Sequence, residues 1–397
     1  MGLDPYVLDW LNLLLRWAHV VVAIAWIGSS FYFVFLDNSL VPPADAQDSA
    51  RGVTGELWAV HGGGFYHPQK YLVAPPALPP KLHWFYWESY STWLTGMALF
   101  TALYLVNAGS FLVDKTVFDW SPAAAGATAL AALALYWLAY DALCRWAGSE
   151  GLVGLGVALL TVAAAWAACQ LFAGRAAFLL TGAMLATAMS ANVFFCIIPG
   201  QRKVMAQMRA GQPVDPQHGR RAKQRSVHNT YLTLPVLVAM LSNHSGWLVQ
   251  GPHNWAVLLL LMAAGALIRH SFVLRHRALV LGRRVPWEHA AGGCVLLLGL
   301  AVWLAPAPLP PSAAGAEPVR FAQVQSVVEA RCTACHNAQV QPKNVALHTQ
   351  ALLQRHAQAV YQQAVVLKLM PLNNATGLTE AERQLLRRWF EAGAAGP

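Results

Sequence analysis

Runs of about twenty apolar residues recur through the first three quarters of this 397-residue chain and stop near residue 305. A helix of roughly that length crosses the ~30 Å hydrocarbon core of a bilayer. We place eight such segments, at 11–35, 84–106, 123–146, 152–172, 176–198, 228–249, 254–274 and 288–305. Only 11% of the residues are charged, against about a quarter in soluble domains. The sequence therefore predicts an all-α fold, with a polytopic helical bundle in a lipid bilayer.

The charges of the connecting loops predict the orientation of this bundle. The loops at 37–82, 145–151, 199–226 and 275–287 together hold 15 Lys and Arg residues, whereas the opposite loops hold only Lys115 and Arg175. Because cytoplasmic loops carry the excess of Lys and Arg, both termini are predicted to lie outside. The net charge of +9 is then a signal of topology, and we expect no nucleic-acid partner.

Beyond the last apolar segment, Cys332-Thr333-Ala334-Cys335-His336 has the spacing C-x-x-C-H. In this motif two thiols hold a haem c covalently, and the histidine provides one axial ligand of the iron. Met370 is the predicted sixth ligand because it is the only methionine of the tail, with His348 and His356 as alternatives. A chance cysteine pair or half of a zinc site is the other interpretation. Haem c is attached on the outer side of the bacterial inner membrane, which agrees with the orientation predicted from the loops.

The composition changes between the bundle and the tail. Residues 305–318 read APAPLPPSAAGAEP, a Pro/Ala-rich spacer. We predict a transmembrane domain at 1–305, a linker at 306–319 and a periplasmic domain at 320–397. An apolar helical face precedes the cysteines, and Thr379 with Glu382 forms a capping box that opens a last helix. Two such helices are typical of a small class I cytochrome c.

Histidines inside the apolar segments are candidate cofactor ligands, because ionisable groups within a membrane mark functional sites. His19 and His244 are predicted to lie in the outer half of the bundle. Imidazoles on facing helices hold haem in helical bundles, so this pair is the first choice for a non-covalent haem b. Hydrogen bonds from these histidines to backbone carbonyls, or a polar cavity, are the open alternatives.

Five further polar residues are predicted toward the inner side of the bundle: Glu88, Asp141, Asn192, His228 and Arg269. Burying them in lipid is costly unless they pair or face a polar pocket. Arg269 suits an anion, and Glu88, Asp141 or His228 suits the role of a catalytic base. A structural ion pair between an arginine and a carboxylate accounts for part of the set as the alternative.

Four segments can be compared with a known family. They are GELWAVHGGGFYH at 55–67, LHWFYWESYSTWLTG at 82–96, SANVFFCIIPGQRKV at 190–204 and RSVHNTYLTLPVLVAMLSNH at 225–244. The four segments occur in this order and are followed by the linker and C-x-x-C-H. With this arrangement the chain resembles the PuuD-type urate hydroxylases, which are bacterial inner-membrane proteins with a C-terminal cytochrome c. The resemblance implies oxidation of urate to 5-hydroxyisourate. It also implies that electrons leave through the tail to a soluble cytochrome c or a terminal oxidase of the respiratory chain.

Two other functions stay open at this point. The first is a b/c-type quinol-oxidising electron-transfer protein without urate chemistry, and Arg16-x-x-His19 before Trp26-x-Gly28 is similar to the haem-binding first helices of membrane protoporphyrinogen oxidases. The second is a purine carrier or redox sensor with a haem tail. Blockers of quinol sites would inhibit the first, whereas a carrier would move urate without Cys332 or Cys335.

Overall fold

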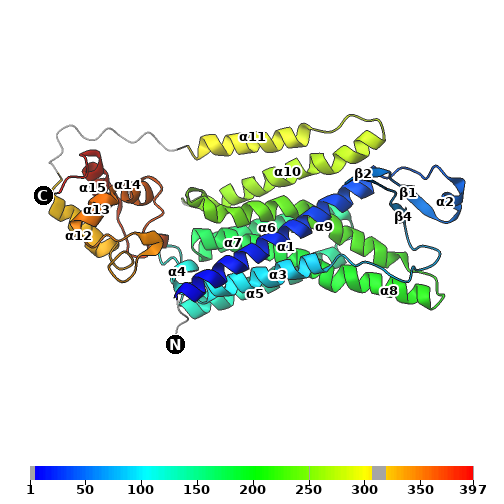
Figure 1. Cartoon of the computed structure of the whole chain (residues 1–397), viewed down its shortest axis with the longest axis horizontal. Coiled ribbons are helices and arrows are strands. Elements are labelled where there is room, and N and C mark those ends of the chain that lie inside the picture. Colours follow the sequence, from blue (N-terminus) through cyan, green and yellow to red (C-terminus); the bar gives the residue numbers. More distant parts are fainter. Residues whose placement is uncertain (1–4, 250, 306–318, 397) are drawn as a thin grey trace.

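Long helices packed side by side dominate the computed structural model, which describes residues 5–249, 251–305 and 319–396 (Figure 1). The helices of the bundle are α1 (Pro5–Ser39), α3 (Trp87–Phe100), α5 (Pro122–Trp146), α6 (Glu150–Leu171), α7 (Gly174–Ala191), α8 (Ile198–Arg209), α9 (Pro216–Leu241), α10 (Asn254–Val280) and α11 (Glu288–Trp303). The predicted all-α class is confirmed, with two small β-ribbons as additions.

Every predicted apolar segment lies on a helix. Within the described residues, five helical stretches are long and apolar enough to cross a membrane: Asp9–Ser39, Pro122–Trp146, Glu150–Leu171, Gly174–Arg209 and Asn254–Val280. The other three predicted segments fall on α3 with the π-helical turn η1 (Thr101–Leu105), on α9, and on the shorter apolar helix α11. These helices fit a membrane protein.

The predicted loop at 199–226 is mostly helical, which corrects the sequence interpretation. A π-helical turn, η2 (Asn192–Ile197), continues α7 into α8, and α9 already begins at Pro216. Asp215 caps α9, since its Oδ1 accepts a hydrogen bond of 2.8 Å from the N–H of Gln217. Proline at the first helical position costs no hydrogen bond there. Hydropathy alone missed these ends because their residues are polar.

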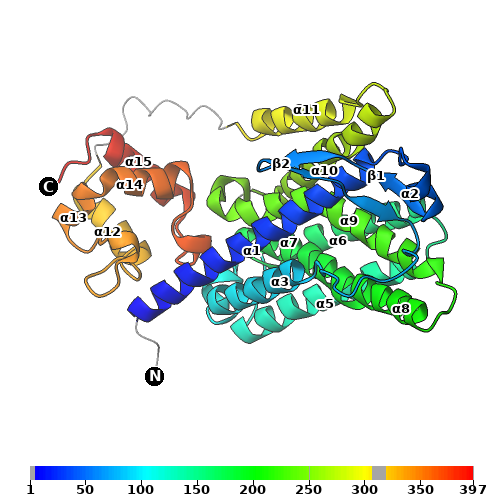
Figure 2. The same cartoon turned by 45° about the vertical axis from the view of Figure 1, so that its right-hand side comes forward.

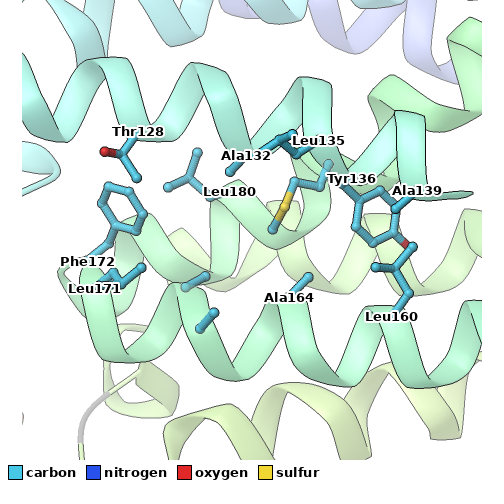
Figure 3. A pocket seen from close by; sticks show the side chains of 13 residues that line it. Thr128, Ala132, Leu135, Tyr136, Ala139, Leu160, Ala164, Leu171, Phe172 and Leu180 are labelled. Atoms are coloured by element: carbon cyan, nitrogen blue, oxygen red, sulfur yellow. The ribbon is translucent and has the colours of Figure 1, made fainter.

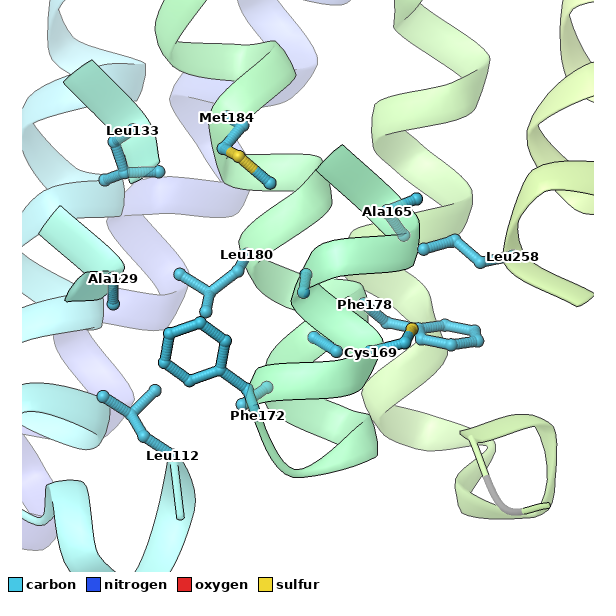
Figure 4. Close-up of a cluster of buried hydrophobic side chains, with 14 of the residues drawn as sticks. Leu112, Ala129, Leu133, Ala165, Cys169, Phe172, Phe178, Leu180, Met184 and Leu258 are labelled. Atoms are coloured by element: carbon cyan, nitrogen blue, oxygen red, sulfur yellow. The ribbon is translucent and has the colours of Figure 1, made fainter. Parts of the chain in front are cut away.

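Helix α7 forms the centre of the bundle. Its side chains are buried along most of its length, and Leu180 and Met184 pack against neighbours from α5 and α6 (Figure 4). Small residues allow this close packing, as is usual between membrane helices. A Cβ atom on Gly182 would lie 2.9 Å from the Cβ of Ala239 on α9.

Between α1 and α3 the chain forms a small element of its own. The helix α2 (Ala46–Ala50) precedes an antiparallel ribbon of β1 (Val53–Glu56) with β4 (Gln69–Tyr71), and β2 (Ala59–His61) pairs with β3 (Gly64–Tyr66). Gly62 and Gly63 connect β2 to β3 with φ of 58° and 81°. Positive φ at both positions is the requirement of the favoured two-residue hairpin turn, so glycine is needed here.

Short elements complete one end of the bundle: α4 (Ala108–Phe111), η3 (Ser242–His244) and η4 (Gly246–Val249). The tail consists of α12 (Phe321–Arg331), α13 (Gln350–Arg355), α14 (Ala357–Val360) and α15 (Glu380–Glu391), with the turns η5 (Pro342–Asn344), η6 (Tyr361–Val366) and η7 (Leu372–Asn374).

The tail has its own core, which includes Phe321, Val324, Leu353, Leu386 and Trp389. The predicted capping box is confirmed: Thr379 Oγ1 accepts from the N–H of Glu382 at 3.2 Å, and Glu382 Oε2 accepts from the N–H of Thr379 at 2.7 Å. That hydrogen bond from Thr379 is the largest cause of the lowered pKa of Glu382. The tail and the first turn of α1 lie at the same end of the bundle in both views (Figures 1 and 2), while residues 306–318 of the predicted linker lie outside the described residues.

Candidate functional site

A buried polar network lies where α5, η2 and α9 meet in the bundle. We call it the Asn192 network; its members are Tyr140 and Asp141 on α5, Asn192 on η2, and Arg225, His228 and Asn229 on α9. Tyr140, Asn192 and Arg225 are almost completely buried. Three residues predicted from the sequence, Asp141, Asn192 and His228, therefore meet in one site.

The hydrogen bonds of Asn192 fix the orientation of its amide. Arg225 Nη1, which can only donate, lies 3.2 Å from Asn192 Oδ1. Asn192 Nδ2 then donates to the Tyr140 hydroxyl oxygen and to Asn229 Oδ1, both at 2.9 Å. Asn229 Nδ2 in turn donates to the carbonyl of Met189 at 3.0 Å. Each amide atom in this set has a partner, which is what a stable buried network needs.

Asp141 and His228 occupy opposite ends of the network. Arg225 Nη2 lies 2.7 Å from Asp141 Oδ1, and the other carboxylate oxygen pairs with Arg145 Nε at 2.6 Å. The Tyr140 hydroxyl oxygen lies 2.8 Å from His228 Nδ1. The second ring nitrogen of His228 takes no part in the network. Asp141 is thus committed to cations, and His228 is the better placed of the two to accept a proton.

The backbone around Asn192 is irregular. Asn192 is the first residue of the π-helical turn η2, between α7 and α8. Such turns are often found at functional sites, because the added residue redirects a side chain. Here the turn directs Asn192 toward α5 and α9. Sequence reasoning did not include Tyr140 and Arg225 in the site.

Arg269 and Glu88 lie apart from this network. The guanidinium carbon of Arg269 on α10 stands 3.7 Å from the ring centroid of Phe31 on α1. No ion pair joins Arg269 to Glu88 within the described part of the chain, and Glu88 Oε2 is buried without a hydrogen-bond partner. Beside Arg269, Tyr231 and His270 form a close pair, with the hydroxyl oxygen 2.7 Å from Nδ1.

The two histidines predicted to bind haem b have different surroundings. His19 Nδ1 lies 3.0 Å from Thr95 Oγ1 on α3, and a Cβ atom on Gly96 would stand 3.1 Å from the His19 ring. His244 is exposed in η3, beyond the end of α9. Their described contacts do not join them. Within the described residues, no group of three or more His, Cys, Asp or Glu side chains is arranged to hold a metal ion.

The tail residues fit the covalent haem that the C-x-x-C-H spacing implies. Cys332 and Cys335 are free cysteines at the end of α12, and burial raises the pKa of the Cys332 thiol to about 11. His336 Nδ1 donates to the carbonyl of Val345 at 2.8 Å. Because a carbonyl can only accept, the hydrogen is on Nδ1, and Nε2 is left as the metal-binding nitrogen.

Met370 lies in a loop that a hydrogen bond joins to α15. Its carbonyl accepts a hydrogen bond of 3.1 Å from Arg383 Nη1 on α15, while its side chain is 37% exposed. Of the alternative ligands, His348 is exposed and His356 is half-buried. Met370 as sixth ligand stays a prediction.

The Met370 loop also contacts the end of the bundle that faces the tail. Asn373 Nδ2 donates to the carbonyl of Ser110, in α4, at 2.8 Å. A Cβ atom on Gly246 of η4 would overlap Leu369 Cδ2 and stand 2.6 Å from Arg175 Nη2. This glycine therefore allows the tail to approach the bundle closely.

Replacing Gly246 with leucine (Gly246→Leu) is expected to loosen this contact. The added side chain overfills the interface, so hydrogen–deuterium exchange of residues 369–374 should become about tenfold faster. Gly148→Leu is the matched control, since a Cβ there meets nothing within 4 Å. Unchanged exchange in Gly246→Leu would show that the tail does not rest on η4.

An apolar hollow of about 290 Å³ opens between α5, α6 and α7 (Figure 3). Its lining includes Ala132, Leu135, Leu160, Phe172 and Leu180, and the hydroxyl groups of Thr128 and Tyr136 are its few polar atoms. Such a lining suits an acyl or isoprenoid chain and does not orient a polar substrate.

Comparison with known proteins assigns the bundle to a protein family. A model of the family described as "Urate oxidase N-terminal" matches residues 5–305, from the first turn of α1 to the end of α11. The tail lies outside this match. Comparison with curated proteins and with solved structures found no match. Because the matched range covers well over half of the chain, the protein belongs to the urate oxidase N-terminal family and has a urate-related role.

Proposed function

We propose that the protein is a membrane-bound urate hydroxylase that passes electrons to the respiratory chain through a haem c in its tail. One observation carries the proposal: a urate oxidase N-terminal match that ends at residue 305 is followed in the same chain by C-x-x-C-H at 332–336. The reaction is urate + H₂O → 5-hydroxyisourate + 2 H⁺ + 2 e⁻. Water provides the oxygen atom, so dioxygen is not consumed.

The haem c would be held by thioether bonds from Cys332 and Cys335 and by His336, with Met370 as the further proposed ligand of its iron. When bound, it supplies one-electron oxidation and reduction at its iron. The packing of α12 against α15, with Phe321 and Trp389 in the core, supports the segment that carries the cysteines. A soluble cytochrome c or a terminal oxidase is the proposed electron acceptor.

The interior of the bundle supplies the proton chemistry in this proposal. His228 stands at the end of the Asn192 network with its Nδ1 against the Tyr140 hydroxyl, which orients the ring. We assign His228 as the base that takes a proton from water or urate. Asp141 and Arg225 position the network through their ion pair. Glu88, with a buried and unpartnered carboxylate oxygen, is the alternative base.

The location follows from the loop charges and the tail. The bundle would lie in the bacterial inner membrane, with the N-terminus and the tail on the periplasmic side. Both ends of the bundle domain lie at one end of the structure, as an even number of crossings requires (Figure 1). Basic residues such as Arg202, Lys203 and Arg209 of α8 lie toward the other end.

The test is anaerobic reduction of the purified, oxidised protein by urate. Urate is expected to produce the α band of reduced haem c, whereas allantoin, which cannot undergo this oxidation, should not. A b-type band in the same spectrum would support a haem b in the bundle, and its loss in His19→Ala or His244→Ala would test each proposed ligand. If quinol reduces the tail and urate does not, the quinol-oxidising function is correct, and the apolar hollow of α5, α6 and α7 is its candidate binding site.

A further inference from the structure

Arg269 is a buried cation without an acceptor. The residue is 6% exposed, and its Nε and Nη2 atoms are buried with no hydrogen-bond partner in the described structure. The flat face of its guanidinium lies over the ring of Phe31 at 3.7 Å. Burying an unpaired charge in this way is costly in a membrane bundle, and such groups mark ligand or ion sites.

The two unpartnered nitrogens belong to the same edge of the guanidinium group. Nε and Nη2 carry parallel N–H groups that form one side of the planar fork, and this geometry matches two adjacent acceptor atoms in a plane. Phe31 covers the face, so the acceptors that Arg269 lacks are those of this buried edge. A ligand that satisfies both donors places two adjacent acceptor atoms in the plane of the fork, and negative charge on these atoms strengthens both hydrogen bonds.

The surroundings of Arg269 are also polar. The neutral hydroxyl-bearing side chain of Tyr231 on α9 lies near Arg269. Tyr231 pairs with His270 at 2.7 Å, the His270 and His289 ring centroids are 4.6 Å apart, and His289 Nδ1 is buried without a partner. Hydroxyl and imidazole groups therefore stand where α9, α10 and α11 meet, and Tyr231 is the member of this group that lies near Arg269.

We propose that the Nε/Nη2 edge of Arg269 anchors a planar heterocyclic anion, with Phe31 fixing the plane of the guanidinium. This inference rests on the proposed function, in which the ligand is the urate anion: a carbonyl oxygen beside a ring nitrogen that has lost its proton accepts both N–H groups. Arg269 then binds the substrate, and the Tyr231–His270 pair lines the same place. A lipid phosphate shares the anionic chemistry, and the experiment distinguishes it.

Binding is measured on the full-length protein, purified in detergent and kept reduced, so that urate binds without being oxidised. Arg269→Lys keeps the charge but loses the fork, and urate should bind about tenfold or more weakly. Arg277→Lys, on the exposed side of the same helix, is the control and should bind as the wild type does. Equal affinity in Arg269→Lys and wild type would overturn the inference while the proposed function stands.

A second readout separates ligand binding from a structural role. Without urate, Arg269→Met should unfold at a higher temperature than the wild type, because an unpaired buried charge is replaced by an apolar side chain. Urate should raise the unfolding temperature of the wild type only. A lower unfolding temperature in Arg269→Met, with unchanged urate affinity, would assign Arg269 to the structure instead.

Two further outcomes complete the test. If purified wild type carries a phospholipid that Arg269→Met lacks, and urate affinity is unchanged, the anion is a lipid headgroup and the inference is wrong. If the wild type neither binds urate nor is reduced by it, the proposed function fails. In that case binding of xanthine or orotate that depends on Arg269 would retain the inference, and binding of neither would overturn it.

Discussion

Replacing Cys332 and Cys335 together with alanine (Cys332→Ala, Cys335→Ala) is expected to remove covalent haem and to reduce urate-dependent electron delivery to background. The two thiols are the only covalent attachment that C-x-x-C-H provides, and His336 alone does not hold the group through purification. The bundle should still fold, because its core and the core of the tail are separate clusters. Haem staining of a denaturing gel and urate-dependent reduction of an added cytochrome c measure the two effects.

The control for this change is another free cysteine. Cys294 is exposed on α11, in the bundle, and Cys294→Ala should retain both haem and electron delivery. Electron delivery that survives the loss of both tail cysteines would contradict the proposed route through the tail. Covalent haem that survives would place the attachment site elsewhere in the chain.

The helices were predictable because each depends on a local property. A run of about twenty apolar residues must pair its backbone groups internally in lipid, and a helix is the way one segment does so. The helix ends were less predictable. α9 begins at Pro216, well before the predicted 228, because Asp215 and Pro216 favour a start among polar residues that hydropathy does not detect.

The Asn192 network was only partly predictable, because its partners are distant in sequence. Asp141, Asn192 and His228 were expected as polar residues in apolar segments. Arg225 was expected in a positively charged loop, yet it is 3% exposed and pairs with Asp141, 84 residues away. A signal was present: Arg225, His228 and Asn229 are spaced i, i+3 and i+4, the pattern of one helical face.

For Arg269 the sequence predicted the type of residue and its burial but not its contacts. Because Arg269 lies in an apolar segment, we expected a buried cation that could bind an anion. Which atoms are left without a partner depends on Phe31, on another helix, and on the rotation of α10 against α1. The same holds for Tyr140, whose hydroxyl has a polar role only because η2 and α9 present Asn192 and His228 to it.

Replacing Arg225 with methionine (Arg225→Met) should destabilise the bundle by about 3 kcal/mol, measured as a lowered unfolding temperature in detergent. The change leaves Asp141 Oδ1 and Asn192 Oδ1 without their buried donor. The loss is expected at the lower end of the range for buried pairs, since Asp141 is 17% exposed and keeps Arg145 as a partner. Arg221→Met should have little effect, since Arg221 lies one turn earlier on α9 and is exposed.

The variant Arg225→Lys then separates structure from chemistry. A lysine can retain the ion pair with Asp141 but not the second hydrogen bond to Asn192, because it lacks the planar fork. If the network orients His228 through Asn192 and Tyr140, urate turnover by Arg225→Lys should fall although its unfolding temperature stays close to that of the wild type. The pH profile of urate turnover should also shift. Equal stability of Arg225→Met and Arg221→Met would contradict the ion pair. Normal turnover in a stable Arg225→Lys would show that His228 does not depend on the network.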